Sequence, residues 1–202
     1  MNLPNKLTIL RILLVPIMVI IPFLNIEGNL LNIPISYIIM DLIFIIASIT
    51  DKLDGSIARS RNMITNFGKF LDPIADKILV LAAMLILVEA GNMPAWIPII
   101  VLAREFAVSA YRLIAVEQGG KVVAASKWGK LKTVTQMIAI IAAFININGT
   151  NIFCNFINGN LTGIELSINI ITSIMLIVST IATIFSGWDY IKDGKKLLLT
   201  EK

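Results

Sequence analysis

Four aspartates lie close together in a chain that is otherwise strongly apolar. Residues 50–77 read TDKLDGSIARSRNMITNFGKFLDPIADK and contain Asp51, Asp54, Asp72 and Asp76. On helices, the first two are spaced i, i+3 and the last two i, i+4, so each pair projects from one face of its own helix. The polar segment between the pairs, with Asn and Gly, favours a turn that folds the second helix back against the first. The spacing therefore predicts that the four carboxylates meet.

Such a cluster predicts a metal site. Four neighbouring carboxylates cannot all stay ionised at neutral pH unless cations lie among them, and oxygen-only ligands favour hard divalent ions such as Mg²⁺ or Mn²⁺. The chain has no histidine and one cysteine, Cys154, which excludes intrachain disulfides, His/Cys zinc sites and His-dependent nucleophile systems. The plainer interpretation is that the aspartates are helix-end residues paired with neighbouring lysines at the membrane surface. Gly55 and Gly68, which allow close backbone approach, favour a site.

The composition predicts an all-α, polytopic membrane protein. Of 202 residues, 57% are hydrophobic and 15% charged, and the mean hydropathy is +0.86. Because about 20 apolar residues cross a bilayer, six spanning helices are expected, near 7–25, 34–58, 71–90, 94–117, 131–150 and 164–188. Residues 2–11 mix polar and apolar side chains, which predicts a short interfacial segment before the first helix. No cleavage site follows, so we expect that helix to be retained and residues 1–202 to form a single domain.

Basic residues alternate with connection number along the chain. They occur at the N-terminus, in the second and fourth connections and in the tail, and they are missing from the first, third and fifth connections. By the positive-inside rule, both termini and the membrane face nearest the aspartates are cytoplasmic. We therefore expect a multi-pass protein of the cell membrane whose active face is the cytosolic one.

The aspartate stretch resembles the signature of a known enzyme family. The residues Asp51-x-x-Asp54-Gly55-x-x-Ala58-Arg59, followed after eight residues by Gly68-x-x-x-Asp72-x-x-x-Asp76, are similar at every fixed position to the signature of the CDP-alcohol phosphotransferases. The resemblance implies a membrane enzyme that passes the phosphoryl-alcohol group of a CDP-linked substrate to an acceptor hydroxyl and releases CMP. It also implies that the four aspartates hold a pair of Mg²⁺ or Mn²⁺ ions around the diphosphate, and that Asp76 also serves as the base.

The N-terminus extends this resemblance. Pro4-Asn5-x-x-Thr8-x-x-Arg11 is similar to the opening of many family members, which implies a contribution to the nucleotide pocket. An N-capped first helix with an interfacial arginine is the plainer alternative. With Arg59 contacting phosphate, the residues expected on the nucleotide and diphosphate side are Asn5, Thr8, Arg11, Gly55, Ala58, Arg59 and Gly68.

Cations within the fourth and fifth apolar runs predict an anion site. Arg104 and Arg112 are spaced i, i+8, and intramembrane arginines need partners, for which phosphate is well suited. The alternatives are a structural Arg104–Glu105 pair and, for the lysines of the fifth run, a cluster on anionic lipid. The segments REFAVSAYR and SKWGKLKTVTQ resemble those of phosphatidylglycerophosphate synthases, the branch whose acceptor is sn-glycerol 3-phosphate. The resemblance implies that Arg104, Arg112, Lys130 and Lys132 bind the acceptor phosphate.

The expected reaction is therefore phosphatidyl transfer from CDP-diacylglycerol to sn-glycerol 3-phosphate. The same chemistry with inositol phosphate, serine or a lipid as acceptor stays open, as do direct transfer and a covalent intermediate. A divalent-cation transporter would need acidic residues at the membrane midplane, whereas these lie toward one face. A lipid-binding scaffold gives no reason for clustered aspartates. The expected partners are membrane lipids and a second copy of the chain in a homodimer, and no nucleic acid.

Overall fold

The computed structural model describes residues 3–30, 33–60, 66–117, 127–146 and 163–198 and is predominantly helical. The sequence prediction of an all-α protein is confirmed for these residues, apart from one short β-ladder in which Leu30 pairs with Ile33. The elements, in chain order, are α1 (Leu3–Ile20), η1 (Ile21–Leu24), β1 (Asn29–Leu30), β2 (Ile33–Pro34), α2 (Ile35–Ser60), α3 (Asn66–Glu89), α4 (Trp96–Glu117), α5 (Lys127–Ile145) and α7 (Gly163–Leu198).

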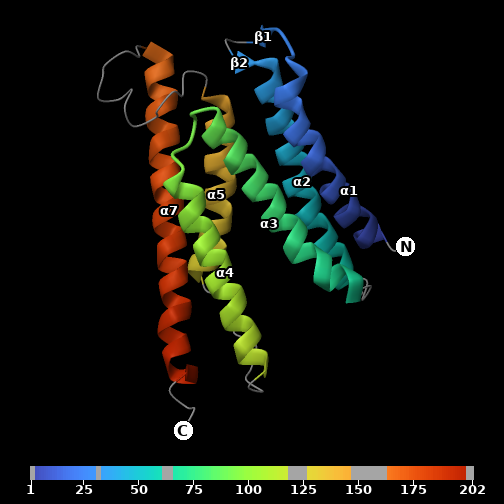
Figure 1. Ribbon diagram of the computed structural model, residues 1–202, viewed down its shortest axis with the longest axis vertical. Coiled ribbons are helices and arrows are strands. Elements are labelled where there is room, and N and C mark those ends of the chain that lie inside the picture. The colour runs from blue at the N-terminus through green and yellow to red at the C-terminus, as the bar shows by residue number, and fades with distance from the viewer. Residues whose placement is uncertain (1–2, 31–32, 61–65, 118–126, 147–162, 199–202) are drawn as a thin grey trace.

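The helices pack as two groups joined through α5. Helix α1 packs on α2 and α3, while α7 packs on α5 and α4, and α5 also contacts α2 and α3. Figure 1 shows the start of α1, the end of α2, the start of α3 and the ends of α4 and α7 toward the lower end of the bundle. The β-ladder, the α3–α4 turn and the start of α7 lie toward the upper end. The described helix ends that flank alternate connections thus lie at opposite ends of the bundle.

A tight turn sets the direction of α4 relative to α3. Gly91 has φ 76°, a left-handed conformation that glycine adopts without strain. Its N–H donates to the Val88 carbonyl at 3.1 Å, and the Asn92 N–H donates to the Leu87 carbonyl at 2.8 Å, which is the hydrogen-bond pattern of a Schellman C-cap. The Asn92 side chain also donates to the Ala143 carbonyl at 3.3 Å. This turn therefore both ends α3 and holds it against α5.

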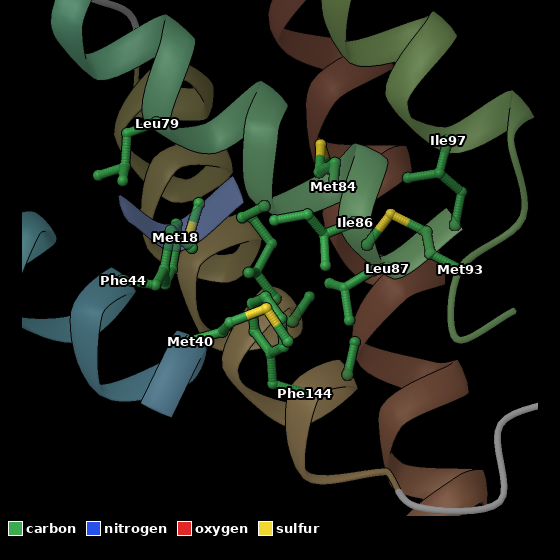
Figure 2. Close-up of a cluster of buried hydrophobic side chains, with 14 of the residues drawn as sticks. Met18, Met40, Phe44, Leu79, Met84, Ile86, Leu87, Met93, Ile97 and Phe144 are labelled. Carbon is green, nitrogen blue, oxygen red and sulfur yellow. The ribbon is translucent and has the colours of Figure 1, made fainter. Parts of the chain in front are cut away.

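The apolar core lies where α1, α2, α3 and α5 converge, with the start of α4 at its edge. Figure 2 shows Met18, Phe44, Leu79 and Phe144 among its buried side chains, each at most 1% exposed. Four methionines are part of this cluster, and their flexible side chains fill gaps between helices that cross at irregular distances. The core thus fixes the relative positions of the helices that carry the aspartates.

The distribution of polar residues is that of a membrane protein. Large apolar side chains such as Ile17, Leu85 and Ile99 are exposed, whereas Asn169 and Thr183 are fully buried. An apolar exterior around a partly polar interior is stable in lipid and costly in water. The described residues therefore support the expectation of a membrane protein.

Three helices are long and apolar enough to cross a bilayer within the part of the chain that the structure describes. They are Asn5–Leu24, Trp128–Ile145 and Gly163–Tyr190. The other long helices, α2, α3 and α4, match the expected spans in position but carry the functional charges within their length, which lowers their apolar character. One expectation is wrong: Leu3 already begins α1, so no separate interfacial segment precedes this helix in the described residues.

Candidate active site

One face of α1 carries a polar stripe directed into the bundle. Asn5, Thr8 and Arg11 are spaced by three residues, so they lie on one side of the helix, and Val15 and Met18 continue that line as apolar core residues. Arg11 is 0% exposed and Thr8 1% exposed. These side chains therefore point into the bundle and not toward lipid headgroups. This agrees with a pocket at this position and not with an interfacial arginine.

The stripe on α1 contacts one carboxylate on each of the two neighbouring helices. Arg11 Nη1 lies 2.8 Å from Asp51 Oδ1 on α2, and the Thr8 hydroxyl donates to Asp72 Oδ1 on α3 at 2.6 Å. Because a buried arginine is costly without an anion, the ion pair gives Asp51 a fixed position. Helix α1 therefore links the two aspartate pairs that the sequence analysis expected to meet.

Asp76, the fourth aspartate of the signature, lies on α3 and interacts with residues of several helices. Its carboxylate lies within electrostatic range of Asp51, Arg11, Lys132 and Glu105, and it lines a cavity together with Glu105 and Lys132. It stands one helical turn beyond Asp72 on α3, as the i, i+4 spacing requires. Asp76 thus interacts electrostatically both with residues of α1 and α2 and with Glu105 on α4 and Lys132 on α5.

Part of the predicted nucleotide side lies outside the described side chains. The structure gives the helical backbone of α2 through Asp54, Gly55, Ala58 and Arg59, but not the positions of their side chains. Gly68 is buried near the start of α3. Among the described side chains, no three acidic residues converge closely enough to form a metal site by themselves.

The donor chemistry nevertheless fits a divalent cation. Asp51, Asp72 and Asp76 each carry a carboxylate, and an ionised carboxylate has two oxygens with several lone pairs. The donors near the site are carboxylate oxygens, and hard ions such as Mg²⁺ prefer such ligands. The described part of the motif is therefore compatible with the metal expected from the sequence.

A cavity of about 370 Å³ lies between α3, α4 and α5. Asp76, Glu105 and Lys132 line its polar end, and apolar residues such as Leu81 and Leu102 line the rest. Lys132 is only 8% exposed, so its ammonium group faces the interior of the bundle. Of the four cations predicted to bind the acceptor phosphate, Lys132 is the one that lines this cavity.

Glu105 holds two of the predicted acceptor-binding cations through one oxygen atom. Arg104 Nη1 and Lys132 Nζ each lie 2.7 Å from Glu105 Oε1. The structural Arg104–Glu105 pair, which the sequence analysis kept as an alternative, is therefore present. Because Glu105 carries one negative charge and Arg104 and Lys132 carry one positive charge each, the three side chains together keep a net positive charge.

Tyr190 on α7 contacts both arginines of α4. Arg112 Nη2 donates to the Tyr190 hydroxyl at 2.8 Å, and the guanidinium carbons of Arg104 and Arg112 lie 5.6 and 5.5 Å from the centre of the ring. Cations at this distance are attracted by the electrons of an aromatic face. Arg104 also donates to the Ser186 hydroxyl. The last turns of α7 therefore orient both arginines.

Close packing of α7 on α4 depends on a glycine at this level. A Cβ atom at Gly187 would lie 3.3 Å from Arg104 Cγ, which is tighter than an ordinary van der Waals contact.

Lys130, the fourth cation predicted to bind the acceptor phosphate, is exposed. Residues 130 and 132 are separated by about 200° around a helix, so they face different sides of α5. Lys132 thus lines the cavity, Arg104 and Arg112 gather around Tyr190, and Lys130 lies on a different, exposed side of α5.

Sequence reasoning missed Glu105 as the shared anion and missed Ser186 and Tyr190 altogether. A signal for the α7 residues was present. Asn169, Thr172, Ser179, Thr183, Ser186 and Tyr190 are all buried, and successive members of this series are three, four or seven residues apart. Such spacing places polar groups on one face of a helix that is otherwise apolar. That pattern indicates that α7 faces a polar interior.

Comparison with known proteins gives one family along almost the whole chain. The family model for CDP-alcohol phosphatidyltransferase matches residues 1–185. The chain is 41% identical to a CDP-diacylglycerol–glycerol-3-phosphate 3-phosphatidyltransferase of Bacillus subtilis, over 98% of both chains. It is 38% identical to the protein of the same name from Haemophilus influenzae, over 98% of this chain and 96% of the other. Its polar site on α1, α2 and α3 is formed by residues of the family signature, and the chain belongs to the CDP-alcohol phosphatidyltransferase family.

Proposed function

We propose that this protein transfers the phosphatidyl group of CDP-diacylglycerol to sn-glycerol 3-phosphate, giving phosphatidylglycerophosphate and CMP. The observation that carries the proposal is that Asp76, a signature carboxylate, lines the same cavity as Lys132 and Glu105. A nucleotide site and an anion site thereby share one acidic residue. The names of the relatives, which specify the same donor and acceptor, support this choice.

The nucleotide and diphosphate side comprises the signature and the α1 stripe. We assign it to Asn5, Thr8, Arg11, Gly55, Ala58, Arg59 and Gly68, together with the aspartates. Asp51, Asp54, Asp72 and Asp76 would hold a pair of Mg²⁺ or Mn²⁺ ions. When bound, these ions would neutralise negative charge on the diphosphate and on the departing CMP. Thr8 and Arg11 would keep Asp72 and Asp51 oriented for this task.

The acceptor side comprises the cations at the opposite edge of Asp76. Lys132, Arg104 and Arg112 would bind the phosphate of glycerol 3-phosphate, which leaves a free hydroxyl of the acceptor beside Asp76. In a direct transfer, that hydroxyl oxygen forms a bond with the phosphorus attached to diacylglycerol. Its proton passes to Asp76, the bond from that phosphorus to the oxygen bridging it to CMP breaks, and CMP departs with this oxygen. Positioning of the two substrates is the main contribution of such a site.

The membrane arrangement follows from the same proposal. We propose that α2, α3 and α4 span the cell membrane together with the three more apolar helices, because each has 22 residues or more, which is long enough to cross a bilayer. The aspartate end would face the cytoplasm, where basic residues concentrate. A homodimer stays a prediction from the resemblance.

Measurement of CMP release tests the reaction directly. Purified protein in mixed micelles receives CDP-diacylglycerol and Mg²⁺ with glycerol 3-phosphate, inositol phosphate, serine or no acceptor. We expect release with glycerol 3-phosphate only, and none after EDTA treatment until Mg²⁺ or Mn²⁺ is restored. Release with a different acceptor would reassign the acceptor side, and release with no acceptor would indicate hydrolysis. Full activity in EDTA would contradict the metal assignment.

Two lysines on the same helix provide a matched test of the acceptor side. Lys132→Met removes a cation that lines the cavity, so the KM for glycerol 3-phosphate should rise by about ten- to hundredfold, as for loss of a charged hydrogen bond. Lys130→Met removes an exposed cation and should change that KM by less than about threefold. Neither change should alter the KM for CDP-diacylglycerol. Equal effects of the two variants would place the acceptor phosphate elsewhere.

A further inference from the structure

A second cavity lies at the end of the bundle opposite to the aspartates. Its volume is about 380 Å³, and its walls come from η1, β2, the start of α2 and the end of α3. Figure 1 shows these segments toward the upper end of the bundle, beside the β-ladder. We call this space the ladder cavity. None of the residues that line it belongs to the family signature.

Three polar side chains line the ladder cavity without a partner in the described part of the chain. Glu89 is exposed at the end of α3, and Ser36 and Tyr37 are partly exposed in the first turn of α2. No ion pair or side-chain hydrogen bond with another described residue engages any of the three. Their oxygen atoms are therefore available to a ligand in the cavity.

The charge around the ladder cavity is negative. Every lysine and arginine of the chain lies within residues 6–11, 52–77, 104–132 or 192–202, so the segments that form the cavity contain no cation that could pair with Glu89. Glu89 is also the last residue of α3, and the carbonyl groups at the end of a helix carry a partial negative charge. The cavity therefore favours a positively charged ligand over an anion.

The lining favours an organic cation over a metal ion. Divalent ions such as Ca²⁺ take about six or more oxygen ligands, several of them charged, whereas Glu89 is the one carboxylate among the described residues that line this cavity. Met40 and Ile86 form a buried apolar floor, and Pro22 adds exposed apolar surface. Such walls suit the hydrocarbon groups of an organic ammonium ion, whose charge is attracted by an aromatic face such as that of Tyr37.

Backbone contacts hold both walls of the cavity in place. The Ile35 N–H donates to the Gly28 carbonyl at 3.1 Å, and the Ala90 N–H donates to the Ile86 carbonyl at 2.9 Å. Gly28 has φ 118°, and a Cβ atom there would lie 2.8 Å from Ile35 Cδ1, so the chain before the β-ladder packs closely against the start of α2. A site whose walls are formed in advance loses less entropy when a ligand binds.

We propose that the ladder cavity binds an organic ammonium group, with Glu89 as its counter-ion and the Tyr37 ring and Ser36 hydroxyl beside it. The ammonium belongs to a lipid head group or to a small soluble amine, since both present the same charge next to hydrocarbon. The site does not rest on the proposed phosphatidyl transfer, because it lies at the other end of the bundle and uses no residue assigned to the donor or the acceptor.

The methyl group of Met40, on the floor of the cavity, gives a reporter of binding that does not require turnover. Protein with isotope-labelled methionine methyl groups is placed in phosphatidylglycerol nanodiscs and observed by NMR during titration with tetramethylammonium chloride or sodium chloride. We expect the Met40 resonance to shift and saturate with tetramethylammonium only, while the Met137 resonance on α5 stays in place. An equal response to sodium chloride would overturn the proposal.

Two substitutions and a matched control test which groups hold the cation. Glu89→Gln removes the counter-ion and Tyr37→Leu removes the ring, and each should raise the dissociation constant for tetramethylammonium by about fivefold or more. Glu165→Gln removes the same charge from the start of α7, outside the cavity, and should change that constant by less than about twofold because salt screens distant charges. The Met137 resonance shows whether each variant keeps its fold. Unchanged binding by the folded Glu89→Gln protein would contradict the assignment.

Nanodiscs of a second composition distinguish the two sources of the ammonium group. If a lipid head group supplies it, replacing part of the phosphatidylglycerol by phosphatidylethanolamine should shift the Met40 resonance, and Glu89→Gln should reduce this shift. If a soluble amine is the ligand, the change of lipid should leave the resonance in place, and tetramethylammonium should shift it equally in both membranes. A Met40 resonance that neither phosphatidylethanolamine nor tetramethylammonium moves would show that the cavity does not bind ammonium groups.

Discussion

At the scale of single residues, two carboxylates of the signature have partners that fix their direction. Asp51 is paired with Arg11, and Asp72 accepts a hydrogen bond from Thr8. Both partners come from α1, and both are buried. A ligand whose side chain is held in advance loses less conformational entropy when it binds. The α1 stripe therefore prepares the site before any substrate is present.

Thr8 allows this preparation to be tested without removing a carboxylate. Thr8→Val preserves the shape of the side chain but removes the hydroxyl that donates to Asp72. Loss of a hydrogen bond to a charged group corresponds to about 1.5–3 kcal/mol, so kcat/KM should fall by about ten- to hundredfold. Thr8→Ser keeps the donor and should retain most activity, whereas Asp72→Asn should abolish turnover. A Thr8→Val enzyme with full CMP release would show that this hydrogen bond is dispensable.

Tyr190 gives a corresponding test on the acceptor side. Tyr190→Phe keeps the ring near Arg104 but removes the hydroxyl that accepts from Arg112. A hydrogen bond from a charged group is worth about 1.5–3 kcal/mol, which predicts a rise of about ten- to hundredfold in the KM for glycerol 3-phosphate, with no change for CDP-diacylglycerol. Tyr190→Leu, which also removes the ring, should raise the KM for glycerol 3-phosphate further. The same change at neighbouring Tyr111, Tyr111→Phe, is the control. A Tyr190→Phe effect on the lipid KM alone would assign Arg112 to the donor side.

The site residues that could be predicted from the sequence are those that recur at helical spacing within one segment. Asn5, Thr8 and Arg11 are regularly spaced, and so are the aspartates, so each set could be assigned to one helix face. Tyr190 could not be assigned this way, because an aromatic residue near the end of a span is most simply explained by the membrane interface. Its role depends on the packing of α7 against α4, which no local pattern specifies.

At the scale of helices, α1 combines two functions along one face. Its first half directs polar side chains toward the site, and its second half directs Val15 and Met18 into the core. The sequence analysis assigned residues 2–11 to an interfacial segment because polar and apolar residues alternate there. In the structure the same alternation serves the interior, since the polar residues face carboxylates and not water. Composition alone could not distinguish these two environments.

The stability of α1 against α2 should depend on Arg11. Arg11→Met removes a fully buried guanidinium group and leaves Asp51 without this partner, so the free energy of unfolding should fall by on the order of 1–3 kcal/mol. Lys6→Met, at an exposed position of the same helix, is the matched control and should have little effect. Thermal unfolding in detergent without substrate measures the difference. Equal unfolding temperatures for Arg11→Met and the unmodified protein would contradict a stabilising role of the ion pair.

The helix boundaries show what hydropathy can and cannot specify. The expected runs 34–58 and 94–117 agree closely with α2 and α4, because apolar length limits where a helix can lie. The final helix extends to Leu198, ten residues beyond its expected end, since a helix can continue through a polar sequence outside the apolar run. Which helices are neighbours was not predictable, because contacts such as α2 with α5 depend on the whole bundle.

At the scale of the molecule, the helix ends that carry the aspartates gather at one end of the bundle. The end of α2 and the start of α3, which carry the aspartates, lie toward the same end of the bundle as the end of α4 (Figure 1). A soluble phosphorylated acceptor would approach from that end, whereas a lipid donor would approach from the side. Because the two substrates differ so much in polarity, separate routes allow them to meet at Asp76 without either crossing an unfavourable environment.

This arrangement predicts which end of the bundle faces the cytoplasm. In a Cys154→Ser background, Asn29→Cys places a thiol on the exposed β-ladder and Lys192→Cys places one on the exposed face of α7 near its end. Because basic residues concentrate at the end with Lys192 and not near Asn29, the positive-inside rule places Lys192 inside the cell. An impermeant thiol reagent should label the Asn29→Cys protein in intact cells, and the Lys192→Cys protein only after the membrane is permeabilised. The reverse pattern would place the aspartates at the outer face of the membrane, away from cytosolic glycerol 3-phosphate, and would contradict the proposed reaction as well as the topology.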